Sequence, residues 1–223
     1  MPDDWTALLG DAVRSLARRP AGELAYLTAT SKVEGPVRDA VAFALHQRLG
    51  PAGYVIAREF PMDPREPKRP GTNRPRCDLA VLPPGGPHML PVIEVEAKAL
   101  YGCNVMGMGS CRDYLSQHKR DADKLARSPA AGYLLSLVTH PMGRIPERAY
   151  TVVKYPRAHN AAVDRLGSAE QLHQAADKKW LRELTDRWPT AARVTDLDLG
   201  CAYGIPFRLG CYLVGPLETQ SDA

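Results

Sequence analysis

The sequence predicts an α/β protein with a mixed central sheet flanked by helices. Segments with helix-type apolar spacing stand on both sides of three segments with strand-type alternation, and a fourth, strongly apolar strand segment follows. A chain of 223 residues can bury a sizeable core. We expect a single domain over 1–223, with an N-terminal helix in 1–30, a core in 31–155 and a C-terminal helix and hairpin extension in 156–223.

Four segments predict helices. The first has an apolar stripe, an aspartate cap and a proline after its end, and the last begins with Ser168, which can cap it together with Gln171. The expected helices cover about 4–19, 35–49, 112–127 and 168–188.

Strands are predicted where short apolar or alternating runs lie between turn residues. The glycine- and methionine-rich stretch 101–110 is expected to be a loop. The expected strands are 54–60, 76–82, 91–100 and 131–140, a weaker one at 149–155, and a hairpin of 193–199 with 205–214.

Composition indicates an ordinary globular protein, with 24% charged residues and a net charge of +4. This mild positive charge permits a polyanionic partner without requiring one. The N-terminus lacks the features of a signal peptide, and no apolar run is long enough to span a membrane, so we expect a cytoplasmic chain without a membrane partner.

The positions of cysteine and histidine in the sequence match no metal-binding motif. The five cysteines include no CxxC pair, and their odd number argues against a disulfide framework. The six histidines show no metal-ligand spacing: His46, His88, His118, His140, His159 and His173.

The segment Pro91–Leu100 carries three charges at every second position, Glu94, Glu96 and Lys98. Because successive strand side chains point to opposite faces, the intervening Ile93, Val95 and Ala97 can enter the core while the charges share the other face. A half-exposed edge strand with a solvated face would show the same pattern. The neighbouring strand is therefore needed to choose between the two interpretations.

That neighbouring strand contributes Asp78. Cys77, Leu79 and Val81 are expected on one face of 76–82, which leaves Asp78 on the other and places it beside Glu96. Two adjacent carboxylates repel each other unless a cation neutralises them. Carboxylate and carbonyl oxygens suit Mg²⁺ or Mn²⁺.

An aspartate at the start of one strand, E-x-K on the next and a glutamate on the preceding helix resemble the PD-(D/E)XK nuclease superfamily. The matching residues are Asp78, Glu96, Lys98 and Glu34, with Cys77 in place of the proline in the superfamily's name. The expected element order from Glu34 to about residue 140 also resembles that family's αβββαβ core. The resemblance covers about half of the chain.

The resemblance implies a restriction-endonuclease-like fold in which 31–155 is the catalytic core, and a metal-dependent nuclease that hydrolyses phosphodiester bonds, with DNA favoured. Asp78, Glu96 and the carbonyl of Ala97 would hold Mg²⁺ or Mn²⁺. Adjacent carboxylates favour the charged form of Lys98. We therefore expect a cationic Lys98 that orients the attacking water and the phosphate. The alternative is a catalytically silent nucleic-acid-binding or assembly module of the same fold.

Other candidates have two interpretations each. Glu34 either completes a capping box with Ser31 or, with Gly35 as the cap, reaches the metal site. Glu94 is either a spare ligand or the solvated end of its row, and we expect the second. Gln117 and Lys124 belong to a polar stripe with Asp121 on one helix and could contact the phosphate or the water, or form a solvated face.

Basic residues follow the first predicted strand of the core, in the proline-rich stretch that leads to the second: Arg65, Lys68, Arg69, Arg74 and Arg76. They could follow a nucleic-acid backbone, although a solvated loop has the same composition. A homodimer is compatible with the sequence, and the C-terminal extension could serve dimerisation, substrate recognition or completion of the core.

Overall fold

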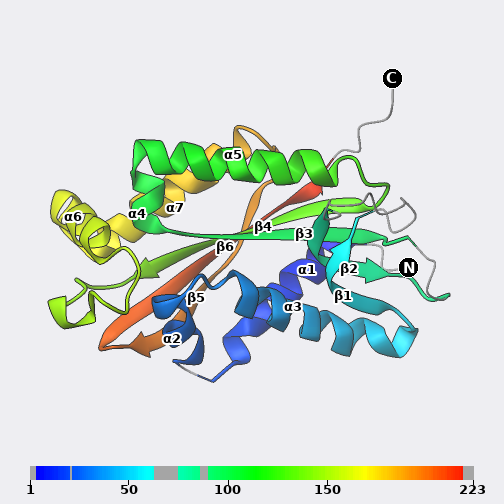
Figure 1. The fold of residues 1–223 in the computed structure, drawn as a ribbon, viewed down its shortest axis with the longest axis horizontal. Coiled ribbons are helices and arrows are strands. Elements are labelled where there is room, and N and C mark those ends of the chain that lie inside the picture. The colour runs from blue at the N-terminus through cyan, green and yellow to red at the C-terminus, as the bar shows by residue number, and fades with distance from the viewer. Residues whose placement is uncertain (1–3, 21, 63–74, 86–89, 218–223) are drawn as a thin grey trace, which may run out of the picture.

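The computed structural model describes residues 4–20, 22–62, 75–85 and 90–217. The protein is α/β, with a six-stranded mixed sheet flanked by helices on both faces (Figure 1). The strands are β1 (Val55–Pro61), β2 (Arg76–Leu82), β3 (Ile93–Tyr101), β4 (Ala131–Pro141), β5 (Ala192–Ala202) and β6 (Ile205–Leu217).

The helices form two layers (Figure 1). On one side of the sheet lie α1 (Trp5–Arg14), α2 (Glu23–Thr30) and α3 (Glu34–Leu49), and on the other α4 (Gly102–Met106), α5 (Met108–Leu125) and α7 (Ala169–Thr185), with α6 (Pro156–Leu166) at one end. Over the described part of the chain, none of these helices is long and apolar enough to cross a membrane.

The strand order is β1-β2-β3-β4-β6-β5. β1, β2 and β3 form antiparallel neighbours, whereas β4 runs parallel to β3. A parallel pair requires a crossover connection, which α4 and α5 supply. β6 then pairs antiparallel with β4, and β5 with β6, so the C-terminal hairpin extends the same sheet.

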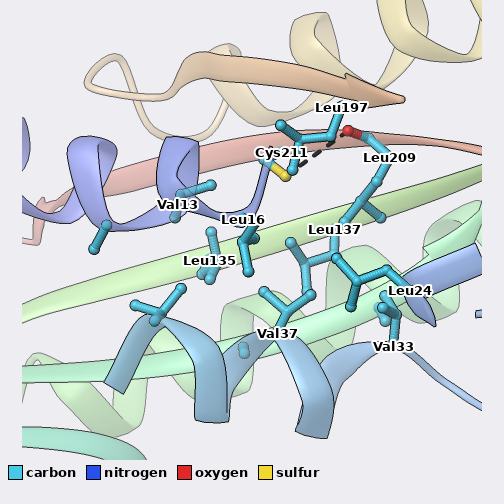
Figure 2. Packing of buried hydrophobic residues seen from close by; sticks show 14 of the residues in the cluster. Val13, Leu16, Leu24, Val33, Val37, Leu135, Leu137, Leu197, Leu209 and Cys211 are labelled. Atoms are coloured by element: carbon cyan, nitrogen blue, oxygen red, sulfur yellow. Dashed lines mark hydrogen bonds between the residues drawn. The ribbon is translucent and has the colours of Figure 1, made fainter. Parts of the chain in front are cut away.

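The larger core lies between the sheet and the N-terminal helices. Alternate residues of β3 and β6 enter it, as their period of two predicts, and they meet Val13 and Leu16 from the start of the chain and Val37 from α3 (Figure 2). The β-strand residues that enter include Ile93, Val95, Ala97, Ile205, Phe207, Leu209, Cys211 and Leu213.

The second core lies under α5 and α7. Trp180 of α7 is fully buried there beside Leu125, Leu134 and Tyr212. Its indole Nε1 donates a hydrogen bond of 2.9 Å to the hydroxyl of Ser136 on β4. The buried indole therefore has a partner for its one donor, as a buried tryptophan requires.

Two expectations about loops and short helices were wrong. The stretch 101–110, expected as a loop from its glycines, forms α4 and the start of α5, because Asn104 accepts a hydrogen bond from the backbone of Tyr101 and closes the first turn. The N-terminal region holds a second helix, α2, which begins after Gly22 in a left-handed conformation.

The C-terminal half also differs from the prediction in two places. Residues 149–155 are not a strand: Ala149 and Val153 are buried in successive turns, so their apolar character reflects burial and not strand alternation. The helix α6 was missed; Pro156 stands at its first position, where a proline is favoured.

Phe207 and Phe43 offer a matched test of the fold. Phe207 is 0% exposed in the larger core, whereas Phe43 of α3 is 61% exposed. We expect Phe207→Ala to lower the free energy of unfolding by about 3–5 kcal/mol, because it removes buried contacts and leaves a cavity. Phe43→Ala should change it by about 0.5 kcal/mol or less. Urea unfolding measures both, and similar losses in the two variants would contradict this fold.

Candidate active site

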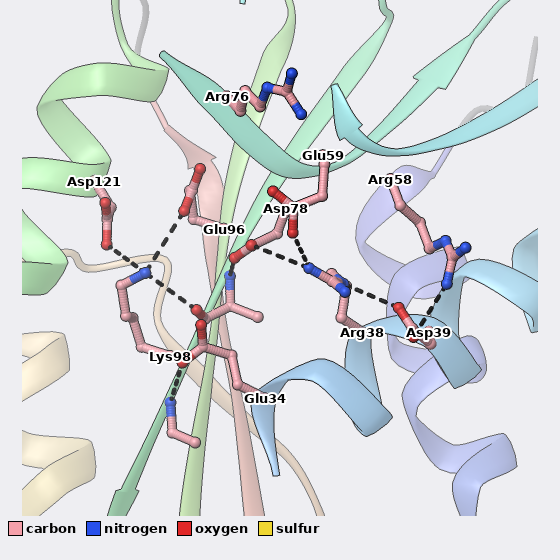
Figure 3. A network of polar contacts seen from close by, with 12 residues as sticks. Glu34, Arg38, Asp39, Arg58, Glu59, Arg76, Asp78, Glu96, Lys98 and Asp121 are labelled. Carbon is pink, nitrogen blue, oxygen red and sulfur yellow. Dashed lines mark hydrogen bonds and ion pairs between the residues drawn. The ribbon is translucent and has the colours of Figure 1, made fainter. Parts of the chain in front are cut away.

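The candidate site lies where β2 and β3 separate. Their ladder pairs Val81 with Ile93, Ala80 with Glu94 and Leu79 with Val95. Beyond Leu79, the side chain of Asp78 accepts the hydrogen bond from the backbone N–H of Ala97, at 2.7 Å (Figure 3). Asp78 is thereby fixed at the edge of the split, next to Glu96.

The expected placement of Cys77 was wrong. Cys77 packs in the core under α5 and α7, whereas Leu79 and Val81 belong to the core on the opposite face. The change of face occurs at the row of Asp78, opposite Glu59, whose φ of 51° interrupts the extended geometry of β1. Simple alternation therefore does not hold across Asp78.

Glu96 is a carboxylate in a buried position. Its side chain is 4% exposed, and the ammonium of Lys124 forms an ion pair with its Oε1 (Figure 3 shows the carboxylate facing Lys98). Burial raises the pKa of Glu96 to about 7, although Lys124 opposes the shift, and the negative charge of Asp78 adds to it. The positive charge present is thus too small to offset the cost of burying this carboxylate.

Lys98 lies between carboxylates. Its Nζ is 3.2 Å from Asp121 Oδ2 and 3.7 Å from Glu96 Oε2, and it donates a hydrogen bond of 3.3 Å to the carbonyl of Ala97 (Figure 3). Burial lowers the pKa of Lys98, but Asp121 and the other carboxylates outweigh burial and leave the pKa above its usual value. The neighbouring carboxylates thus favour the charged form of Lys98.

Glu34 reaches the site from the first turn of α3. Its Oε2 accepts a hydrogen bond of 3.3 Å from the backbone N–H of Ala99, and burial raises its pKa. The capping box is not formed, because the hydroxyl of Ser31 bonds the carbonyl of Leu27. The expectation that Gly35 caps the helix was also wrong, since α3 begins at Glu34 itself with Val33 before it.

The polar stripe on α5 faces the site in part. Lys124 binds Glu96 and also donates a hydrogen bond of 2.9 Å to the carbonyl of Arg76, while Asp121 holds Lys98. Gln117 is partly exposed and makes no side-chain hydrogen bond to another described residue. Asp121 therefore has a firmer place in the site than Gln117, which the sequence favoured.

Arg38 is a member of the site that the sequence analysis missed. Its guanidinium lies 3.8 Å from Asp78 Oδ1 and forms ion pairs with Glu59 and Asp39 (Figure 3). The signal was available, because Arg38 stands four residues after Glu34 and so shares its helix face.

Glu94 and the basic residues near β2 complete the account of the predicted residues. Glu94 was expected at a solvated end of its row, but it is buried, and burial raises its pKa. Arg76 is exposed at the start of β2, beside the site. The remaining basic candidates lie outside the described residues: Arg65, Lys68, Arg69 and Arg74.

Comparison of the chain with protein-family models, with curated proteins and with solved structures found no match. Any inference about function therefore depends on the chemistry of the candidate active site. Its possible metal ligands are carboxylate and carbonyl oxygens, and the ammonium groups of Lys98 and Lys124 lie beside them.

The raised pKa of Glu96 predicts a stability change with pH. Between about pH 4.5 and pH 7 the folded state binds more protons at Glu96 than the unfolded chain does, so its contribution to stability falls as pH rises through this range. Without divalent ions, Glu96→Gln should therefore raise the free energy of unfolding at about pH 8, on the order of 3 kcal/mol, and by much less near pH 5.

Denaturant unfolding at the two pH values measures this effect, with Glu23→Gln on the exposed part of α2 as the control for a glutamate-to-glutamine change. A Glu96→Gln variant that is less stable than the wild type at both pH values would show that the ion pair with Lys124 outweighs the burial cost.

Proposed function

We propose that this protein is a Mg²⁺- or Mn²⁺-dependent nuclease of the PD-(D/E)XK type that hydrolyses phosphodiester bonds, most directly those of DNA. The observation that carries the proposal is the meeting of Asp78, Glu96 and the Ala97 backbone at the split between β2 and β3, with Lys98 beside them. Glu34 approaches the same strand from α3.

The order of elements supports the proposal. From α3 to β4 the chain forms a helix, three antiparallel strands, a helical crossover and a strand parallel to the third. This order is compatible with the αβββαβ core that the resemblance implies. The C-terminal hairpin then adds β6 and β5 beyond β4.

The residues at the split fit a hard divalent cation. They supply carboxylate and carbonyl oxygens, which Mg²⁺ and Mn²⁺ prefer. Glu96 is buried, and its raised pKa shows that the nearby positive charge does not balance its carboxylate. Asp78, Glu96 and the Ala97 carbonyl would hold the ion, with Glu34 as a further acidic group. When bound, such an ion lowers the pKa of a water molecule and offsets charge on the phosphate.

Lys98 and Lys124 have separate tasks in this proposal. Lys98, held by Asp121 and by the Ala97 carbonyl, keeps its positive charge and orients the attacking water and the scissile phosphate. Lys124 pairs with Glu96 in the structure, and its side chain is partly exposed. When substrate binds, Lys124 leaves Glu96 and pairs with a phosphate of the substrate. A second cation then lies beside the reacting phosphate.

One observation favours the alternative of a silent module. The charges of the site already pair internally, Lys124 with Glu96 and Arg38 with Asp78, and such pairs also serve a protein that only binds nucleic acid. The two functions differ in whether metal binding and strand cleavage depend on the same residues.

Metal binding should raise the melting temperature through Asp78. A ligand present at about 100 times its dissociation constant stabilises the native state by about 2.7 kcal/mol. We expect Mg²⁺ to raise the melting temperature of the wild type but not that of Asp78→Asn, which retains an acceptor for the Ala97 N–H and loses the charge. Asp11→Asn, an exposed control on α1, should respond as the wild type does. An equal response in Asp78→Asn would place the ion elsewhere.

Lys98 should be needed for cleavage and not for the fold. With Mg²⁺ and a supercoiled plasmid, we expect Lys98→Ala to reduce strand cleavage by about 100-fold or more while the variant still folds and binds DNA. Lys98→Arg should restore little activity, because a planar guanidinium replaces a compact ammonium.

The matched control is Lys119→Ala, which removes an equal charge from an exposed position on the same helix as Lys124. It should cleave as the wild type does. Full cleavage by Lys98→Ala would exclude the proposed mechanism, and the absence of metal-dependent cleavage by the wild type, with DNA binding intact, would favour the silent module.

A further inference from the structure

A second cluster of polar side chains lies on the α7 side of the sheet. His140 stands at the end of β4, and His173 and Asp177 stand four residues apart on α7. Along β4, His140 is four residues beyond Ser136, the partner of Lys98, which corresponds to about 13 Å at the usual rise of a strand. The cluster is therefore separate from the candidate active site.

The nitrogen and oxygen atoms of the cluster have the spacing of ligands around one ion. His140 Nε2 is 3.0 Å from Asp177 Oδ1, and His173 Nε2 is 3.2 Å from Asp177 Oδ2. A tetrahedral ion with ligands at about 2.0–2.2 Å separates neighbouring ligand atoms by about 3.4 Å. A second carboxylate, Asp196 of β5, lies 3.5 Å from His173 Nε2 through its Oδ2, which also pairs with Arg193 and Arg208.

The two imidazoles approach Asp177 without forming well-aligned hydrogen bonds. His140 is 2% and His173 4% exposed, and neither ring makes a hydrogen bond of normal geometry with the described part of the chain, although Asp177 lies close. Buried polar groups without partners are costly and rare in folded proteins. One cation between the rings and the carboxylates would bind a nitrogen of each ring at once.

The surrounding groups orient the carboxylate of the cluster. Tyr212 donates a hydrogen bond of 2.6 Å to Asp177 Oδ1 and Arg193 pairs with Oδ2. A carboxylate accepts about four hydrogen bonds, so each oxygen keeps a lone pair for the ion.

Gly102 allows the helix α4 to close over His140. A Cβ at this position would lie 2.7 Å from His140 Nδ1, which is closer than atoms approach in folded proteins. Because Gly102 has no side chain, α4 can cover the ring of His140 completely. This cover keeps water from the imidazole.

We propose that His140, His173 and Asp177 form a binding site for a zinc-class transition-metal ion. Imidazole nitrogen favours such ions over Mg²⁺. Because both rings are almost completely buried, the site gives a substrate no access and is structural. It connects β4 and α7, and it does not depend on the proposed nuclease activity.

The prediction that the histidines have no ligand spacing needs correction here. His173 and Asp177 stand at i and i+4 of one helix, the spacing that places two ligands on the same face. His140 could not be added from the sequence, because β4 meets α7 only in the folded chain.

The test uses metal-free full-length protein titrated with Zn²⁺ and, in parallel, with Co²⁺, in excess Mg²⁺ to occupy oxygen-only sites. We expect one equivalent of Zn²⁺ per chain, a rise in melting temperature, and the visible absorption of tetrahedral Co²⁺. His173→Gln and Asp177→Asn should each weaken Zn²⁺ binding by about 10- to 100-fold or more. Asp78→Asn should bind Zn²⁺ as the wild type does.

Several results would overturn the proposal. The absence of stoichiometric Zn²⁺ binding by the wild type would show a metal-free network of imidazoles and carboxylates. Unchanged affinity in folded His173→Gln would do the same, and His140→Gln provides a second variant should the first not fold. Thiolate-to-cobalt absorption in the near ultraviolet would assign the ion to exposed Cys201 instead.

Discussion

The arrangement of the candidate active site depends on the hydrogen bond between the Ala97 N–H and the carboxylate of Asp78. In a continued β2–β3 ladder, a backbone carbonyl of β2 would accept this hydrogen bond. Because Asp78 accepts it instead, the two strands can separate here without leaving the Ala97 N–H unpaired. The separation opens the row of Glu96 and Lys98 toward α5, and toward Glu34 on α3. The carboxylate of Asp78 thus replaces a backbone carbonyl as the acceptor for Ala97, and this position determines how the charged side chains around it are arranged.

The buried charged side chains between β2 and β3 lower the stability of the fold, but they also supply the groups that could bind a cation. Glu96 and Glu34 have raised pKa values because burial disfavours their charged forms, while Lys98 is kept cationic by the surrounding carboxylates. A protein selected for stability alone would place apolar residues here. Two buried hydrophobic cores, one on each face of the sheet, offset this cost.

Local patterns in the sequence were sufficient for most strands and for the adjacency of Asp78 and Glu96, because strand alternation and a short connection are local properties. They failed where tertiary contacts decide. Cys77 changes face at an irregular row that no alternation encodes, α4 forms although glycines surround it, and Arg38 gains its role from contacts with β1 and β2. The cluster at His140 likewise joins segments that are far apart in the chain.

The claim that Glu96 is a metal ligand, and not only the buried partner of Lys124, is tested most directly by calorimetric titration of Mg²⁺ in buffers of different ionisation enthalpy. Because the pKa of Glu96 is about 7, we expect binding at pH 7 to release about half a proton per ion, and almost none at about pH 9. Glu96→Gln should bind weakly and release no proton. Binding without proton release at pH 7, unchanged in Glu96→Gln, would contradict the account.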